Sequence, residues 1–307
     1  MRCNNFAILG PRDSRPLMKP WFVVLPLVAA CLVSPSAAAQ MPTRDVYVGV
    51  VDGKGAPVTD LTAADFSVRE DGVAREVLKA APATEPMQIA VLVDDSQAAT
   101  DEIQMMRDGL TRFVDALRGK AEIALITFGE RPTLLVDYTA DPAKLKQGIG
   151  RVFARSGAGA YFLEAVVEAS RGFEKREAKR PVMVALMTEG LEFSTLYYQR
   201  VLEALEKSRA ALHVLTMTGV TAASTDEVRN RNILVAEGTE RTGGRRDQIL
   251  APSGIPDRMQ QLADELIHQY VVTYARPETL IPPEKNDVTV KRPGVTTRAR
   301  TRTAGRS

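Results

Sequence analysis

Cysteine and histidine are scarce in this sequence of 307 residues, and several catalytic motifs are absent from it. The two cysteines, Cys3 and Cys31, both lie in an N-terminal segment that we expect to be removed. Without them the remaining chain can form neither a disulfide framework nor a cysteine metal site. The two histidines, His213 and His268, have structural roles available in a strand and at a helix end, and no G-x-S-x-G motif accompanies them. This pattern argues against serine-type hydrolysis.

A phosphate-binding loop of the Walker type is absent as well. The run SGAGAY (156–161) has small residues but lacks the closing G-K-[ST]. The run RTGGRR (241–246) offers backbone N–H groups and cations to an anion, although a turn between two elements is the simpler interpretation. The formal net charge of +2 indicates no particular class of partner. We therefore expect no enzymatic activity, and no cofactor beyond Mg²⁺ or another divalent cation.

Residues 1–39 have the organisation of a secretory signal peptide. After Met18, which we predict to be the true start, a lysine is followed by an apolar run from Trp21 to Val33 and by three alanines at 37–39. This order matches the n-region, h-region and A-x-A cleavage site of a signal peptide. The apolar run is too short to span a bilayer comfortably. We predict an exported protein, periplasmic or extracellular, with no transmembrane segment in the mature chain.

The run VAAC (28–31) offers a second interpretation of this segment, because it resembles the bacterial lipobox that is cut before a lipidated cysteine. Cys31 would then carry a lipid anchor. The A-x-A site fits the segment better, since Leu32 follows the cysteine where a polar residue is usual.

Residues 44–82 are predicted to form a small β segment. Val46, Val48 and Val50 alternate with other residues, DGKG (52–55) supplies a turn, and FSVRED (66–71) alternates again before a second turn. A segment of this size cannot bury a core alone, so we expect it to pack on the larger segment C-terminal to it. A further β-strand and a basic tail are predicted over 277–307. This tail has no interleaved aromatic residues to stack bases, so we interpret it as a polar edge strand and expect no nucleic-acid partner.

Apolar strand-like runs alternate with helical patterns over residues 87–276. MQIAVLVDD (87–95) is followed by apolar residues at spacings of three and four from Ile103 to Leu117, and this rhythm continues along the segment. The apolar runs at 121–129 and 132–139 are separated by too little chain for a crossover helix, which predicts an antiparallel pair. The pattern as a whole predicts an α/β fold: a mainly parallel sheet with helices on both faces and one antiparallel edge strand.

Polar residues follow or adjoin the predicted strands at positions where a site would form. In open α/β sheets, binding sites lie beyond the carboxyl ends of the strands. VDDSQAA (93–99) ends the first strand of the segment, SGAGAYFLEAV (156–166) leads into a helix, and LMTEG (186–190) ends a later strand. These three stretches are therefore expected at one edge of the sheet.

With these stretches the sequence resembles the von Willebrand factor type A domain, and in particular the exported bacterial proteins that carry a VWFA-related domain. The resemblance extends over nearly the whole mature chain, including the β segment, TGGR (242–245) and QYVVTYARP (269–277). It implies a Rossmann-like fold over 87–276. It also implies a non-enzymatic module that binds another protein or another macromolecule of the cell envelope.

In that family a metal-ion-dependent adhesion site holds a divalent cation, usually Mg²⁺. Its pattern is Asp-x-Ser-x-Ser in the first loop, Thr in the second and Asp in the third, and hard cations of this kind take oxygen ligands. The resemblance places Asp94 and Ser96 on the first two positions and Glu189 in place of the third-loop aspartate. Two alanines, Ala98 and Ala160, stand where the second serine and the threonine are expected.

Because alanine supplies no oxygen ligand, we predict a degenerate adhesion site and binding without metal. Side-chain alternation directs Asp95 and Thr188 away from the ion position. Mg²⁺-dependent binding of a protein carboxylate remains the alternative. The residues that would hold any remaining ion are Asp94, Ser96 and Glu189. The rim around it is formed by Asp95, Ala98 and Ala160.

A receiver domain of a response regulator is a remote alternative. The acidic pair in VLVDDS (91–96) and Asp137 would supply its phosphate-acceptor site. The short link between 121–129 and 132–139 leaves no room for the helix that a receiver needs there. The export signal is also wrong for a cytoplasmic phosphorelay.

Overall fold

The computed structural model describes residues 42–218, 225–277 and 281–302. The predicted signal peptide with its start at Met18, the lipid-anchor position Cys31 and the last residues of the basic tail lie outside the described residues. In the part of the chain that is described, no helix is both long enough and apolar enough to cross a membrane.

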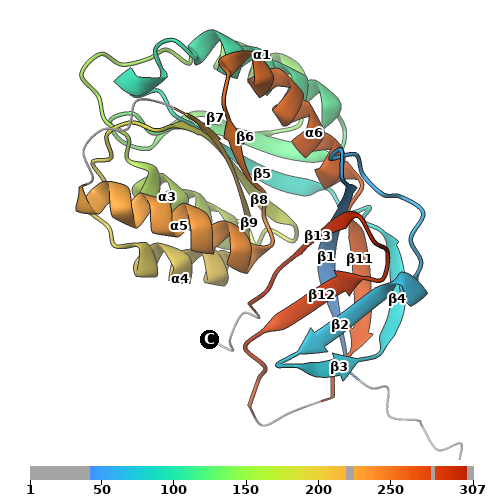
Figure 1. Ribbon diagram of the computed structural model, residues 1–307. Coiled ribbons are helices and arrows are strands. Elements are labelled where there is room, and N and C mark those ends of the chain that lie inside the picture. Colours follow the sequence, from blue (N-terminus) through green and yellow to red (C-terminus); the bar gives the residue numbers. More distant parts are fainter. Residues whose placement is uncertain (1–41, 219–224, 278–280, 303–307) are drawn as a thin grey trace, which may run out of the picture. The chain divides into compact units, whose positions relative to one another are not determined.

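Six strands form a central sheet in the order β10-β9-β8-β5-β6-β7 (Figure 1). Neighbouring strands are parallel except β6 and β7, which pair antiparallel. The predicted mainly parallel sheet and its antiparallel edge strand are thus confirmed. The strands are β5 (Met87–Val93), β6 (Ala121–Thr127), β7 (Thr133–Thr139), β8 (Pro181–Thr188), β9 (Ala211–Met217) and β10 (Arg246–Ile249).

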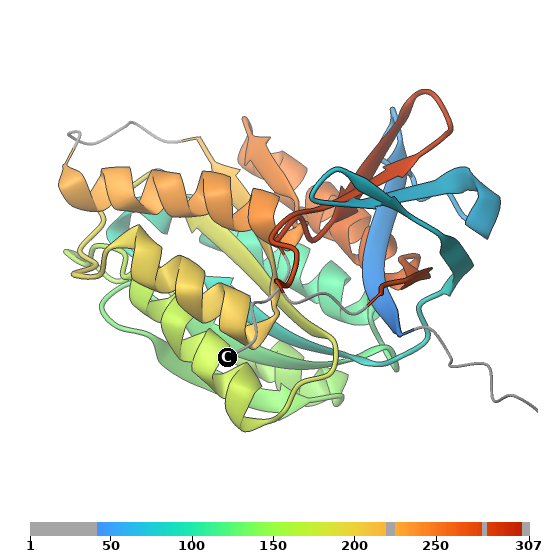
Figure 2. The same cartoon turned by 90° about the horizontal axis from the view of Figure 1, so that it is seen from below.

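Helices cover both faces of this sheet, as Figures 1 and 2 show. Successive side chains of β5 point to opposite faces, so Ile89 and Val91 join one hydrophobic cluster while Ala90 and Leu92 join the other. Burial on both sides is why this strand reads as a continuous apolar run in the sequence. The first face carries α1 (Ile103–Ala116), α2 (Pro142–Ile149) and α6 (Ile255–Ile267), and the second carries α3 (Phe162–Lys175), α4 (Tyr198–Ser208) and α5 (Asp226–Thr242).

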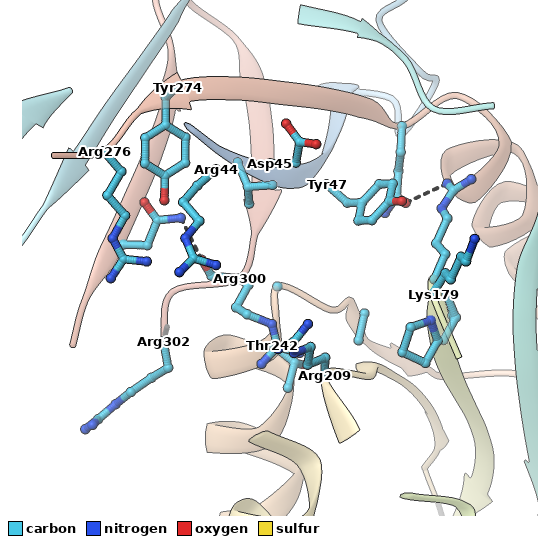
Figure 3. A pocket seen from close by; sticks show the side chains of 18 residues that line it. Arg44, Asp45, Tyr47, Lys179, Arg209, Thr242, Tyr274, Arg276, Arg300 and Arg302 are labelled. Carbon is cyan, nitrogen blue, oxygen red and sulfur yellow. Dashed lines mark hydrogen bonds between the residues drawn. The ribbon is translucent and has the colours of Figure 1, made fainter. Parts of the chain in front are cut away.

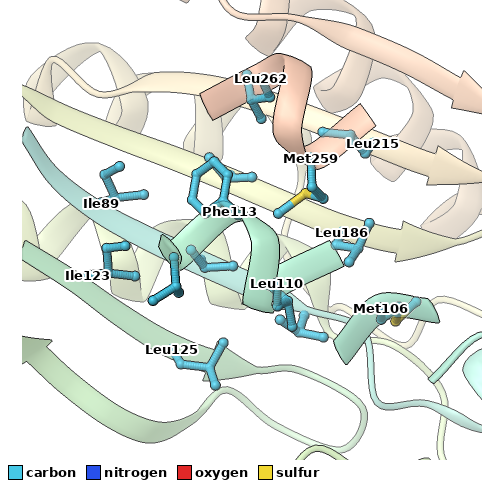
Figure 4. Packing of buried hydrophobic residues seen from close by; sticks show 14 of the residues in the cluster. Ile89, Met106, Leu110, Phe113, Ile123, Leu125, Leu186, Leu215, Met259 and Leu262 are labelled. Carbon is cyan, nitrogen blue, oxygen red and sulfur yellow. The ribbon is translucent and has the colours of Figure 1, made fainter. Parts of the chain in front are cut away.

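The packing of α1 and α6 shows how the first face is closed. Leu110 and Phe113 of α1 and Met259 and Leu262 of α6 are almost completely buried over the strands (Figure 4). The spacings of three and four predicted from the sequence therefore mark the buried side of each helix. Three short 3₁₀ turns complete the helical elements: η1 (Ala63–Asp65), η2 (Gln97–Ala99) and η3 (Pro252–Gly254).

The remaining strands form two antiparallel sheets from the two ends of the described chain. One has the order β13-β1-β11-β4 and the other the order β12-β2-β3. Alternate residues of β1, Val46, Val48 and Val50, pack with Phe66 and Val68 of β2 in a common core. The hairpin between β2 and β3 turns at Asp71 and Gly72, both with positive φ, as a two-residue hairpin turn requires. The strands are β1 (Thr43–Asp52), β2 (Phe66–Glu70), β3 (Val73–Arg75), β4 (Val77–Pro82), β11 (Tyr270–Ala275), β12 (Asn286–Val290) and β13 (Val295–Ala299).

Three elements differ from the sequence-based interpretation. Helix α5 and strand β10 were not predicted. The run RTGGRR forms the expected turn between them, and β10 extends the central sheet beside β9. The apolar run at 270–275 belongs to the predicted 87–276 segment, yet its strand β11 pairs with β1 and β4 outside the central sheet. The last part of that segment thus contributes to the antiparallel core.

Candidate functional site

The predicted site residues lie in loops at the carboxyl edge of the central sheet. Asp94 directly follows β5 and its N–H donates to Leu186 O of β8, while Glu189 directly follows β8 and its N–H donates to Met217 O of β9. Ala160 precedes α3 in the second loop. The parallel order of β5, β8 and β9 therefore gathers the three loops at one edge.

The Asp94 carboxylate is completely buried and accepts hydrogen bonds at both oxygens. Oδ1 accepts from Ser96 N at 2.9 Å. Oδ2 accepts from Thr188 N at 3.0 Å and from Thr188 Oγ1 at 2.6 Å. Thr188 was predicted to point away from the ion position, yet the end of β8 brings its hydroxyl onto the Asp94 carboxylate. Asp94 therefore ties the first loop to the end of β8.

Ser96 presents a polar atom that the protein leaves without a hydrogen bond. Its Oγ is buried and has no partner, whereas its backbone N–H is used by Asp94. Beside it, Ala98 lies against the third loop, since a Cβ added to Gly190 would lie 2.4 Å from Ala98 Cβ. Ala160 is buried and pairs with the third loop through its backbone, donating to Leu191 O and accepting from Phe193 N. The two alanine positions thus serve close packing between loops.

Asp95 faces away from Asp94 and is neutralised by a cation from the second loop. Its Oδ2 accepts from Arg155 Nε at 2.9 Å and its Oδ1 accepts from Gly129 N at 2.5 Å. Asp95 is almost completely buried, and the hydrogen bond to it is the main reason why the pKa of Arg155 is raised. Arg155 also reaches Glu130 at 3.0 Å. Asp95 is thus used in contacts with the second loop and Gly129, and Arg155 was not singled out in the sequence.

Glu189 is half-buried and its carboxylate faces β10. Its Oε1 accepts from Gln248 Nε2 at 3.4 Å. Glu189 and Gln248 line a cavity of about 420 Å³ together with Arg231, Arg246 and Asp247. The structure therefore brings Asp94 and Ser96 together and directs the Glu189 side chain toward a different neighbour.

Glu192 is a second acidic residue of the third loop, and sequence reasoning missed it. Its Oε1 accepts hydrogen bonds from Phe162 N at 3.0 Å and from Ser194 Oγ, while its Oε2 is buried without a partner. Burial raises the pKa of Glu192 to about 7, and the nearby charge of Asp94 adds to the increase. The only sequence signal was an acid three residues after Glu189, which a solvent-exposed loop would equally carry.

Neither histidine is placed as a catalytic base. His213 is buried in β9 and accepts Arg245 N at Nδ1, and the Nδ1 of His268 contacts Asp264 O at the end of α6. The described ranges also contain no group of three or more His, Cys, Asp or Glu side chains placed to hold a metal ion.

Large apolar side chains are exposed at the same edge of the sheet. Leu191 is 46% exposed and Phe193 44% in the third loop, Tyr197 is 71% exposed before α4, and Leu250 is 83% exposed after β10. Phe193 packs edge-on against Tyr161, with ring centroids 6.2 Å apart. We call the surface formed by these loops the carboxyl rim; it comprises residues 94–100, 155–161, 189–197 and 250.

Comparisons with solved structures find similar proteins at low identity. A von Willebrand factor type A protein from Catenulispora acidiphila is 12% identical, with 87% of this chain and 75% of that chain covered and a TM-score of 0.48. Protein BatB from Bacteroides thetaiotaomicron is 14% identical, with 59% of this chain and 98% of that chain covered and a TM-score of 0.45. The vWF domain of the type V pili tip protein Mfa5 from Porphyromonas gingivalis is 12% identical, with 60% of this chain and 96% of that chain covered and a TM-score of 0.44.

The search of curated proteins gave no match. Residues 89–191, which include most of β5, the first two loops of the carboxyl rim and the start of the third, match the family model described as the von Willebrand factor type A domain. The order and direction of the strands agree with this match, and the chain thus contains a segment, residues 89–191, that is similar to the von Willebrand factor type A domain.

Proposed function

We propose that this chain is a non-catalytic protein-binding module that recognises its partner through the carboxyl rim without a metal ion. The observation that carries the proposal is the hydrogen bonding of the Asp94 carboxylate. Both oxygens of this carboxylate accept hydrogen bonds from the protein's own N–H and O–H groups. The residue expected to anchor a cation is thereby used to hold two loops together.

The arrangement does not fit a Mg²⁺ ion, for reasons of ligand number. Mg²⁺ requires near-octahedral oxygen coordination. Ser96 Oγ is the one predicted ligand atom without a hydrogen-bond partner, Ala98 and Ala160 supply no side-chain oxygen, and Glu189 faces Gln248. A degenerate site is therefore the interpretation that we adopt, and Mg²⁺-dependent binding of a protein carboxylate is the alternative to be tested.

The exposed apolar residues of the carboxyl rim support a macromolecular partner. Several large exposed apolar side chains in one loop, here Leu191, Phe193 and Tyr197, are more typical of a contact surface than of a free surface. With the predicted signal peptide, the partner is expected to be a protein or another macromolecule of the cell envelope, met in the periplasm or outside the cell.

Metal independence is tested by thermal unfolding of the purified chain in millimolar Mg²⁺ or Mn²⁺ and in EDTA. An ion that binds only the folded state raises the unfolding free energy by RT ln(1 + [L]/Kd), about 3 kcal/mol at one hundred times Kd. We expect no such difference for the wild type or for Asp94→Ala. A metal-dependent increase in the wild type that Asp94→Ala abolishes would overturn the proposal in favour of the adhesion-site alternative. Because each protein is compared with itself, destabilisation by the substitution does not affect the result.

The role of the carboxyl rim is tested with a pair of double variants. Leu191→Ser with Tyr197→Ser removes two exposed apolar side chains from the rim, and Val73→Ser with Leu78→Ser removes two of similar exposure from β3 and β4. Immobilised proteins are exposed to solubilised envelope proteins in EDTA. We expect the wild type and the β-strand variant to retain the same partner and the rim variant to lose it. Equal retention by both variants would contradict binding through the rim.

A further inference from the structure

A second cavity, of about 400 Å³, lies at the amino ends of β8 and β9, at the opposite edge of the central sheet from the carboxyl rim. Pro181 and Ala211, the first residues of these strands, form part of its wall. Residues of β1, β11 and the segments around β12 and β13 complete the lining (Figure 3). A cavity of this volume is in the range of small-molecule sites.

The lining of this cavity is strongly basic. Of its eighteen residues, seven are Lys or Arg and one, Asp45, is acidic. Three of the seven cations are already engaged by the protein: two pair with carboxylates, and one, Arg180, uses both of its terminal nitrogens in hydrogen bonds to uncharged oxygens. Arg276 pairs with Glu70 at 3.3 Å and Arg302 approaches Glu284 at 3.9 Å. The third, Arg180, donates from Nη2 to Leu266 O and to Gln269 Oε1, and from Nη1 to Glu85 O.

The other four cations have no carboxylate at ion-pair distance among the described residues. We call them the basic quartet: Arg44, Lys179, Arg209 and Arg300. They come from four separate places in the chain, namely β1, the loop before β8, the end of α4 and the end of β13. Arg209 holds its position in a left-handed backbone conformation at the end of α4, with φ 58°. Asp45, the acidic lining residue, accepts a hydrogen bond from Thr273 Oγ1.

Arg300 is the member of the basic quartet with a buried donor that the protein leaves without a hydrogen bond. Its Nη2 donates to Ala210 O at 3.0 Å, but its Nη1 is buried and has no hydrogen-bond partner. Burial lowers the pKa of Arg300 to about 10, and the charge of Arg209 acts in the same direction. The charge of Glu206 acts in the opposite direction, but this carboxylate pairs with Arg241 at 3.2 Å. A buried charged donor without a partner is costly, and an anion in the cavity would satisfy it.

We propose that this cavity binds a small ligand with at least two phosphate groups, either free in solution or as the headgroup of a lipid. Two phosphate groups carry about three to four negative charges near neutral pH, which matches the four charges of the basic quartet. Arginine forks bind phosphate oxygens through two parallel hydrogen bonds, and lysine adds a point charge. The site is independent of the carboxyl rim, so it stands whether or not the rim binds a protein.

The proposal is tested by calorimetric titration of the full chain with tripolyphosphate at a constant ionic strength of about 0.15 M, where long-range attraction is largely screened. Arg44→Gln with Lys179→Gln is the pocket variant, since both side chains are exposed and their loss should leave the fold intact. Lys144→Gln with Arg171→Gln removes the same charge from exposed positions outside the cavity. Arg300→Gln tests the buried donor, and circular dichroism checks the fold of each variant.

We expect saturable binding by the wild type and the control variant, and an affinity weakened by about tenfold or more in the pocket variant and in Arg300→Gln. Flotation with phosphatidylcholine vesicles, with and without a phosphoinositide bisphosphate, identifies the source: binding to these vesicles that the pocket variant loses indicates a lipid headgroup, and binding of tripolyphosphate alone indicates a free ligand. The proposal is overturned if neither probe binds, if the control variant loses as much affinity as the pocket variant, or if citrate binds as tightly as tripolyphosphate.

Discussion

His213 shows at the scale of one residue how burial in the central sheet affects stability. The side chain is completely buried in β9, its Nδ1 accepts Arg245 N at 3.0 Å, and its Nε2 has no hydrogen-bond partner. Burial lowers the pKa of His213 from 6.5 to about 3, and the charges of Arg298 and Arg245 add to this effect. The imidazole is therefore neutral in the folded protein throughout the physiological range.

A pH dependence of stability results from this shift. Between pH 6.5 and about 3 the unfolded chain binds a proton at His213 that the folded chain does not, so stability falls as the pH is lowered through this range. The loss should amount to about 2 kcal/mol between pH 7 and pH 5. Glu192 acts in the opposite direction, because its pKa of about 7 lets the folded chain hold a proton that the unfolded chain releases.

Urea unfolding at pH 5 and pH 7 of the wild type, His213→Leu and His268→Leu isolates the contribution of His213. We expect His213→Leu to lose less stability on acidification than the wild type by about 2 kcal/mol, whatever its stability at pH 7. His268→Leu removes an exposed imidazole and is the control for the loss of a histidine as such. Identical pH dependence in all three proteins would show that the buried imidazole is not the source.

The chemistry of the candidate site was only partly predictable at this scale. The residue types at Asp94, Ser96, Ala98 and Ala160 could be read directly, and they suffice to predict a shortage of oxygen ligands. The direction of a side chain just beyond a strand depends on how the backbone leaves the sheet, which alternation does not determine. For this reason Thr188 was assigned the wrong direction, and the contact between Glu189 and Gln248 could not be foreseen.

At the scale of the element, a glycine just after a helix and a glycine inside a helix differ in whether the structure has room for a side chain. Gly243 closes α5 with φ 73°, and the next residue, Gly244, passes so close to β9 that an added Cβ would lie 1.7 Å from Leu212 O. Gly172 lies inside α3, and an added Cβ there would meet nothing within 4 Å. Position 244 needs glycine because the backbone of β9 lies so close, whereas position 172 has room for a side chain.

Alanine substitutions at Gly244 and Gly172 should therefore change stability in opposite directions. Gly244→Ala is expected to destabilise the protein by about 3 kcal/mol or more, because backbone atoms must move apart. Gly172→Ala should stabilise it by about 0.5 to 1 kcal/mol through the higher helix propensity of alanine. Denaturant unfolding of both variants measures the difference. A neutral Gly244→Ala variant would show that α5 and β9 can separate at little cost.

The elements themselves were predictable where their pattern was long. Strands buried on both faces gave continuous apolar runs, and α1 gave a clear periodicity of three and four. β10 has only four residues, of which Ile249 alone is apolar and buried, so no pattern could reveal it. Its place in the sheet results from pairing with β9, a tertiary contact. The sequence could not predict which sheet β11 joins, since a buried strand has the same composition in either sheet.

At the scale of the whole molecule, a buried carboxylate connects a helix of the central sheet to a strand of the antiparallel sheet. Glu265 of α6 is almost completely buried; its Oε1 lies 2.9 Å from Arg298 of β13 and its Oε2 lies 3.5 Å from Arg245, just before β10. Arg245 is itself buried and also pairs with Asp247 at 2.5 Å. Because α6 packs on the central sheet and β13 belongs to the antiparallel sheet, Glu265 links the two hydrophobic cores through charge.

Glu265→Gln should weaken this link and the molecule as a whole. Two arginines would lose their shared negative charge in a buried setting, which we expect to cost about 2 to 4 kcal/mol in the free energy of unfolding. Glu168→Gln, at an exposed position of α3, should change stability by no more than about 0.5 kcal/mol. Amide hydrogen exchange should also show faster opening of β13 relative to β5 in Glu265→Gln, because Arg298 of β13 would lose its carboxylate partner on α6. If β13 and β5 instead keep their relative exchange rates while the stability falls, the ion pair stabilises α6 locally and the two cores are held together by their apolar contacts alone.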